Sequence, residues 1–162
     1  MANASHSTRR GLAVWVVYGA STWAFLFAAL SFFWALGGRT GLHPFENVSG
    51  DPSLLIASNV AAGIGKVLIG LLPLALLQGR RVILQWRTLL IAAWVVGIGM
   101  CVYGGLGLVS DVLHVTGVIA DPTNREWFLV FLVLWDPWWV LGGILYMATA
   151  RLVQSSHDNS SG

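Results

Sequence analysis

Four long apolar stretches constrain this chain more than any other feature of its sequence. They run over about 11–36, 53–78, 88–112 and 127–150, and each exceeds the roughly 20 residues that a helix needs to cross a bilayer. Backbone groups in hydrocarbon are satisfied only within helices or closed barrels, and the alternating pattern of barrel strands is absent. The sequence therefore predicts an all-α membrane protein, a bundle of four transmembrane helices.

The composition excludes the other broad classes of protein. Of the 162 residues, 56% are hydrophobic and 10% are charged, whereas a soluble domain carries about 25% charged residues. So few polar side chains cannot cover a water-facing surface, and nine Trp with seven Phe are too many for a disordered chain. The single cysteine, Cys101, excludes an intramolecular disulfide.

The distribution of arginine predicts the orientation in the membrane. Six arginines flank one side of the predicted spans and two flank the other, and the positive-inside rule then puts both termini in the cytoplasm. Residues 1–10 and 151–162 become short cytoplasmic tails around one transmembrane domain at 11–150. The six are Arg9, Arg10, Arg80, Arg81, Arg87 and Arg151, and the two are Arg39 and Arg125.

The excess of arginine over lysine is typical of a GC-rich bacterial genome, with eight arginines against one lysine. We therefore expect a multi-pass protein of the bacterial plasma (inner) membrane, with the lipid bilayer as its first partner.

Small residues predict which helices approach most closely. Helices in lipid associate where small side chains let their backbones meet. The second span offers Ala61 and Gly65, and the third span is rich in glycine, including Gly104 and Gly105. This pattern predicts that the second and third spans form the tight centre of the bundle, unless the glycines simply reflect their general frequency in membrane helices.

Two charged residues lie well inside the spans, and charges at membrane depth are costly and commonly functional. Lys66 is thirteen residues after Ser53 and Asp136 is nine after Trp127, which corresponds to depths of about 20 Å and about 14 Å. Side chains lean toward the helix N-terminus, so the lysine stem reduces this difference. We expect Lys66 and Asp136 to share one polar pocket, either as a functional site or as an ion pair that fixes helix register.

Pro137 is expected to kink the last span because it removes a backbone donor and leaves the carbonyl of Val133 unpaired. Trp138 and Trp139 follow at a depth below the interfacial belt, so their indole N–H groups need partners inside the bundle. Asn59 of the second span is a candidate to complete this polar pocket.

The outer rim holds a weaker candidate site. Asp111 and His114 are three residues apart and share a face if the third helix extends that far. With His43 and Glu46 of the first outer loop, they offer imidazole and carboxylate ligands for a metal ion. The alternative is that these residues are simply solvated.

No catalytic or cofactor motif is recognisable. The chain has no phosphate-binding glycine loop, nucleophile elbow or HExxH sequence, and it has too few basic residues for nucleic-acid binding. We therefore expect no catalytic residue and no cofactor.

Two short motifs resemble a known family. These are Trp34-Ala35-Leu36-Gly37-Gly38 after the first span, and Asp136-Pro137-Trp138-Trp139-Val140-Leu141-Gly142-Gly143 in the last. They are similar to a family of small bacterial membrane proteins with four transmembrane helices and unknown function. The resemblance covers about 11–150 and implies an inner-membrane bundle without supplying an activity.

Three functions remain in order of preference. The first is a non-enzymatic accessory subunit that binds a membrane-protein partner or a second copy of itself. The second is a small oligomeric transporter or proton-coupled carrier that uses Lys66 and Asp136. The third is a membrane enzyme whose substrate meets the Asp136 pocket or the His43 and His114 rim.

Overall fold

The computed structural model describes residues 2–38, 52–78, 85–119 and 125–158, and the elements in these ranges are all helices. The first three spans are α1 (Ala2–Ala35), α2 (Pro52–Gln78) and α3 (Trp86–Val115). The fourth consists of α4 (Arg125–Val130), a π-helical segment (Phe131–Trp135) and α5 (Asp136–Asp158).

The prediction of four membrane-length apolar helices is confirmed. The apolar stretches within them are Gly11–Ala35, Ser53–Gln78, Trp86–Val115 and Phe128–Ser156. By length and composition the chain is a multi-pass membrane protein. Two boundaries differ from the prediction: α1 already begins at Ala2, and α5 continues to Asp158, so both expected tails are partly helical.

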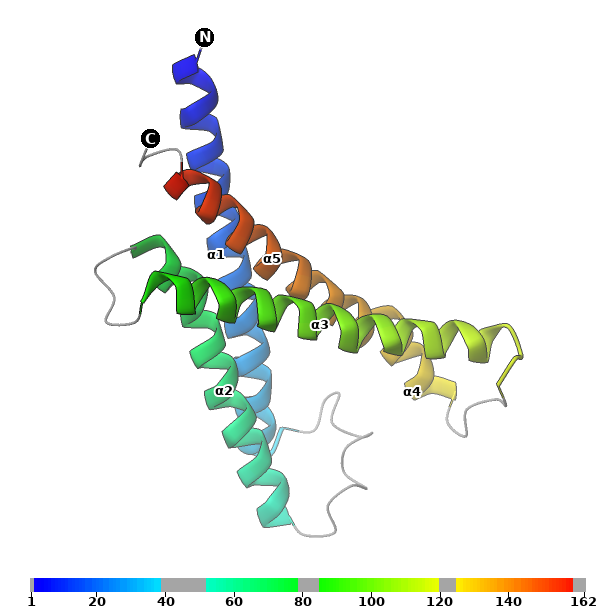
Figure 1. The fold of residues 1–162 in the computed structure, drawn as a ribbon. Helices are drawn as coiled ribbons and strands as arrows, with labels where there is room; N and C mark the ends of the chain where they lie inside the picture. Colours follow the sequence, from blue (N-terminus) through cyan, green and yellow to red (C-terminus); the bar gives the residue numbers. More distant parts are fainter. Residues whose placement is uncertain (1, 39–51, 79–84, 120–124, 159–162) are drawn as a thin grey trace.

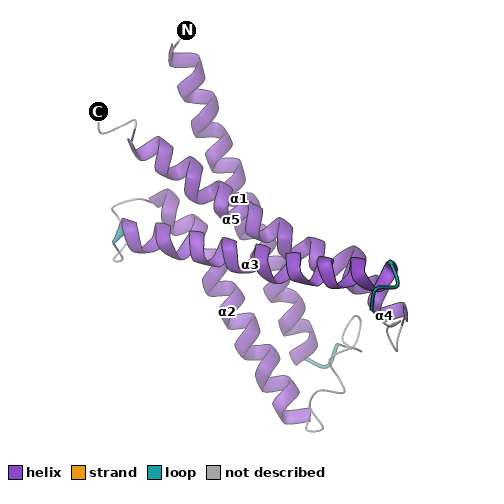
Figure 2. Ribbon diagram, turned by 45° about the vertical axis from the view of Figure 1, so that its right-hand side comes forward, coloured by secondary structure: helices purple, strands orange, loops and turns teal. Residues whose placement is uncertain are grey.

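The helices form two antiparallel pairs. Helix α2 packs along α1 and α5 packs along α3, while α2 and α3 meet over a short stretch only. In Figures 1 and 2 the two pairs cross one another, and the first turns of α1 lie at the same end as the last turns of α5. The expectation that the second and third spans form the tight centre is therefore wrong.

Small residues explain the close approach within each pair. A Cβ atom added at Gly104 of α3 would lie 2.6 Å from the backbone oxygen of Asp136, and one at Gly97 would lie 3.0 Å from that of Gly143. In the other pair, a Cβ at Gly70 of α2 would lie 3.2 Å from the Cβ of Ala24 in α1. Gly70 of the second span thus faces α1, and Gly97 and Gly104 of the third span face α5.

Aromatic side chains join the two pairs at their crossing. The indole N–H of Trp23 in α1 donates a 3.1 Å hydrogen bond to the backbone oxygen of Trp138 in α5. The hydroxyl of Tyr146 in α5 donates a 2.8 Å hydrogen bond to the backbone oxygen of Ile69 in α2. The main cluster of buried side chains surrounds these contacts: Ala20, Trp23, Ala24, Phe27, Trp34, Met100, Trp135 and Tyr146.

Candidate functional site

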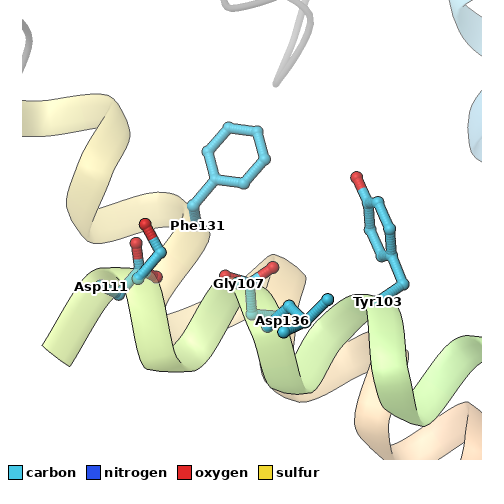
Figure 3. Close-up of a pocket in the computed structure, with 7 residues that line it drawn as sticks. Tyr103, Gly107, Asp111, Phe131 and Asp136 are labelled. Carbon is cyan, nitrogen blue, oxygen red and sulfur yellow. The ribbon is translucent and has the colours of Figure 1, made fainter. Parts of the chain in front are cut away.

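Two buried carboxyl groups meet between α3 and the start of α5. Asp111 comes from the last turns of α3 and Asp136 is the first residue of α5, and their exposed fractions are 7% and 6%. The two side chains are in contact. Figure 3 shows them on the same side of α3. Two acidic side chains in contact at membrane depth are the most unusual feature of this fold.

The contact depends on a glycine of α3. The carboxyl group of Asp136 lies directly over Gly107, and a Cβ atom at that position would overlap with it. Gly107 therefore provides the space into which the carboxyl group enters. Any larger residue there would displace Asp136 from α3.

The π-helical segment explains how Asp136 reaches α3. Pro137 has no backbone N–H to offer, which disfavours regular α-helical pairing just before it. The helical turn instead widens by one residue, and the backbone N–H of Asp136 donates a hydrogen bond to the carbonyl oxygen of Phe131. As a result the neighbouring side chains of Trp135 and Asp136 are both buried. Helical irregularities of this kind often occur at functional sites.

The two carboxyl groups line an open pocket of about 480 Å³. Its other walls are apolar or aromatic, apart from the hydroxyl groups of Ser110 and Tyr103, and its volume lies within the usual range for small-molecule sites. The lining residues, shown in Figure 3, are Tyr103, Leu106, Gly107, Ser110, Asp111, Phe131 and Asp136.

One oxygen of the pair has no partner. The Oδ2 atom of Asp111 is buried without a hydrogen bond. A buried polar atom without a partner is costly. Two carboxyl groups in contact also repel each other when both are ionised. The site therefore gains stability from a shared proton or from a bound cation.

Lys66 lies elsewhere, between α2 and α1. Its Nζ atom donates a 2.7 Å hydrogen bond to the hydroxyl of Ser31 and lies 3.8 Å from the ring centroid of Phe27. The hydroxyl replaces part of the hydration of the ammonium group, and the aromatic face stabilises its charge. Lys66 is half-buried, whereas Ser31 is buried.

The predicted pocket shared by Lys66 and Asp136 is not formed. The Nζ atom of Lys66 lies over the ring of Phe27. The same ring also contacts Trp135, and the centroids of these two rings are 5.4 Å apart. Asp136 follows Trp135 but turns toward Asp111. The two charges were expected together from their similar depths, but depth does not determine which helices pair or which faces meet.

The remaining members of the predicted pocket are also separated. The side-chain amide nitrogen of Asn59 donates a 2.9 Å hydrogen bond to the backbone oxygen of Leu55 in its own helix. Trp138 stacks on Trp23 with 5.9 Å between centroids. Trp139 alone borders the carboxyl site, because its ring lies 5.2 Å from that of Tyr103.

The predicted metal site is not assembled by the described residues. His43 lies outside them, while Asp111 turns into the contact with Asp136 and His114 packs edge-on against Phe128. Among the side chains that the structure describes, no group of three from His, Cys, Asp or Glu is arranged to hold a metal ion.

Asp111 was assigned to the outer rim by the sequence, although a signal for its true place exists. Asp111 follows Gly104 by seven residues and Gly107 by four. These spacings place all three residues on one helical face. Because close-packing glycines mark that face as an interface, an acidic residue on it is a candidate for burial. Tyr103 and Phe131 carry no comparable signal.

Comparison with known proteins identifies a family but no function. No curated protein and no solved structure matches the chain. One family model, described as "Protein of unknown function (DUF3995)", matches residues 24–146. This range extends from the middle of α1 to the middle of α5 and thus includes parts of all four spans. The chain therefore belongs to the DUF3995 family of proteins of unknown function.

Proposed function

We propose that this protein is a proton-coupled carrier of the bacterial plasma membrane, and that Asp111 and Asp136 form its proton-binding site. The observation that carries the proposal is the contact of two buried carboxyl groups at the wall of an open pocket. This proposal replaces the pairing of Lys66 with Asp136 by the pairing of Asp111 with Asp136.

The chemistry of adjacent carboxyl groups supports proton binding. When both groups are ionised in a low-dielectric site, their repulsion is large, and a single proton held between them removes it. The other titratable groups near the pair in the described ranges are few. Tyr103 lines the same pocket, His114 lies one turn further along α3, and Lys66 lies beyond the ring of Phe27.

The proposed orientation has both termini in the cytoplasm, and the arginine distribution supports it. In this orientation α3 runs outward, so the carboxyl pair lies in the outer half of the membrane. A membrane-impermeant maleimide is expected not to label cysteines placed within residues 1–10 in intact cells.

The accessory-subunit role is a second candidate, and exposure of α2 favours it. Ala57 and Ala61 are exposed, and a Cβ atom at Gly65 would meet no other atom within 4 Å. This small-residue face is unused by the helices of the chain itself in the described ranges. Small residues are common where membrane helices associate.

Infrared difference spectroscopy of the protein in proteoliposomes tests proton binding. We expect a carbonyl band of a protonated carboxylic acid to disappear when the pH is raised from about 5 to about 9, because the shared proton then leaves the pair. Asp111→Asn and Asp136→Asn should each remove or shift that band.

Asp158→Asn is the matched control, since this residue ends α5 beyond the last apolar stretch. It should leave the band unchanged. If wild type shows no titrating carboxyl band, or if both pocket variants retain it, the carrier proposal is wrong and the accessory role is favoured.

A further inference from the structure

The walls of the pocket indicate what kind of ligand it accepts. Apart from the carboxyl groups, the polar features of the lining are the hydroxyl groups of Ser110 and Tyr103, and aromatic and aliphatic groups supply the rest. In Figure 3 the ring of Phe131 lies above the carboxyl group of Asp136, and the ring of Tyr103 lies to its right. The ring of Tyr103 is 60% exposed and is held edge-on by Trp139.

This combination suits an organic cation better than a metal ion. A hard metal ion takes six or more oxygen ligands, and aromatic rings and Leu106 offer none. An ammonium group gains from carboxylates and also from aromatic faces within about 6 Å. The volume of about 480 Å³ admits its apolar substituents as well.

Asp111 supplies the second indication of a ligand. It is 7% exposed, it lines the pocket, and its Oδ2 atom has no hydrogen-bond partner. A cation over the pair would compensate this oxygen and one of the two negative charges.

The same chain already holds an ammonium group on an aromatic ring at membrane depth. The Nζ atom of Lys66 lies 3.8 Å from the ring centroid of Phe27, with the Ser31 hydroxyl as its oxygen partner. The carboxyl pocket offers the same two kinds of partner, ring and oxygen. Its oxygens are acidic, so they suit a cation that arrives from outside.

We propose that the pocket formed by Asp111, Asp136, Tyr103 and Phe131 binds a lipophilic ammonium cation in exchange for the proton of the carboxyl pair. This inference rests on the proposed function, and it names the substrate class of the same site. On binding, the O–H bond of the shared proton breaks and the proton leaves to water. The cation then neutralises one of the two carboxylates. The pocket therefore gains one ammonium cation for each proton that it loses, and its net charge does not change.

Binding of benzyltrimethylammonium to the purified full-length protein tests the exchange. Isothermal titration calorimetry gives the affinity, and a pH indicator in weak buffer reports about one proton released per cation bound. Neopentylbenzene, the neutral carbon analogue of the same shape, should release none. Asp136→Asn should weaken cation binding by more than about tenfold, since it removes a full charge from a low-dielectric site.

The aromatic wall is tested by a conservative series. Tyr103→Leu should weaken binding by about fivefold, because one cation–π contact contributes about 1 kcal/mol. Tyr103→Phe should retain the affinity of wild type. Trp15→Leu is the control, since Trp15 is an exposed aromatic residue of α1 that does not line the pocket.

The outcomes separate this inference from the proposed function. If the infrared band of the carboxyl pair titrates but the cation neither binds nor releases a proton, the ammonium inference is wrong and proton binding stands. Equal binding of the cation and its neutral analogue would also contradict it. If the band itself does not titrate, the proposed function fails first.

Discussion

At the scale of single residues, the charges inside this membrane domain are kept apart by aromatic rings. Phe27 contacts both Lys66 and Trp135, and Asp136 is directed toward Asp111. The sequence shows that Lys66 and Asp136 are the unusual residues and places them at similar depths. It does not show their partners, because partners depend on helix pairing and rotation, which no local pattern of this chain determines.

Ser31→Ala should destabilise the protein more than Lys66→Met. Removal of the hydroxyl leaves a half-buried ammonium group without its oxygen partner, at a cost of about 1–3 kcal/mol. Removal of the charge leaves a serine that can bond to its own helix backbone. Thermal melting in detergent measures both effects.

In the same measurement, Lys66→Met and Asp136→Asn should be additive to within about 0.5 kcal/mol, because they share no partner. A strong coupling between them would show that the two charges interact after all.

At the scale of elements, one face of α3 and the π-helical segment Phe131–Trp135 together build the site. The sequence predicts the irregularity from Pro137 alone, since a missing donor must alter the preceding turn. It does not predict that the turn widens into a π-helix, because a kink would also accommodate the proline. The glycines predict close packing on α2 and α3, but Gly65 of α2 and Gly99 and Gly105 of α3 meet no neighbour within 4 Å of an added Cβ.

Gly104→Ala should destabilise the protein by about 1–3 kcal/mol, as overpacking of a tight contact usually does. The new methyl group would meet backbone atoms of Asp136 and Val140, which cannot move aside as a side chain can.

Gly99→Ala is the matched control on the same helix. It meets open space and should be neutral or stabilising, because alanine favours helix more than glycine does. Equal melting temperatures of the two variants would show that α3 and α5 do not pack at Gly104.

At the scale of the whole molecule, two antiparallel helix pairs cross, and the carboxyl site belongs to one pair while Lys66 belongs to the other (Figure 2). The apolar stretches predict the number and order of the spans, because the bilayer sets their length. They do not predict the crossing, since all four helices are similarly apolar and lipid supplies no preference among their faces. The aromatic residues at the crossing couple the two pairs, so a change of charge at the carboxyl site affects the stability of the whole fold.

The most direct test of the carboxyl pair is the melting temperature of the full chain between about pH 5 and about pH 9, for wild type, Asp111→Asn, Asp136→Asn and the double variant. Wild type should lose several degrees as the pH rises, because loss of the shared proton leaves two like charges that repel by roughly 4 kcal/mol at an effective dielectric of about 20. The single variants and the double variant should show little pH dependence, and Asp158→Asn should follow wild type. Parallel pH profiles for wild type and the pocket variants would contradict the account.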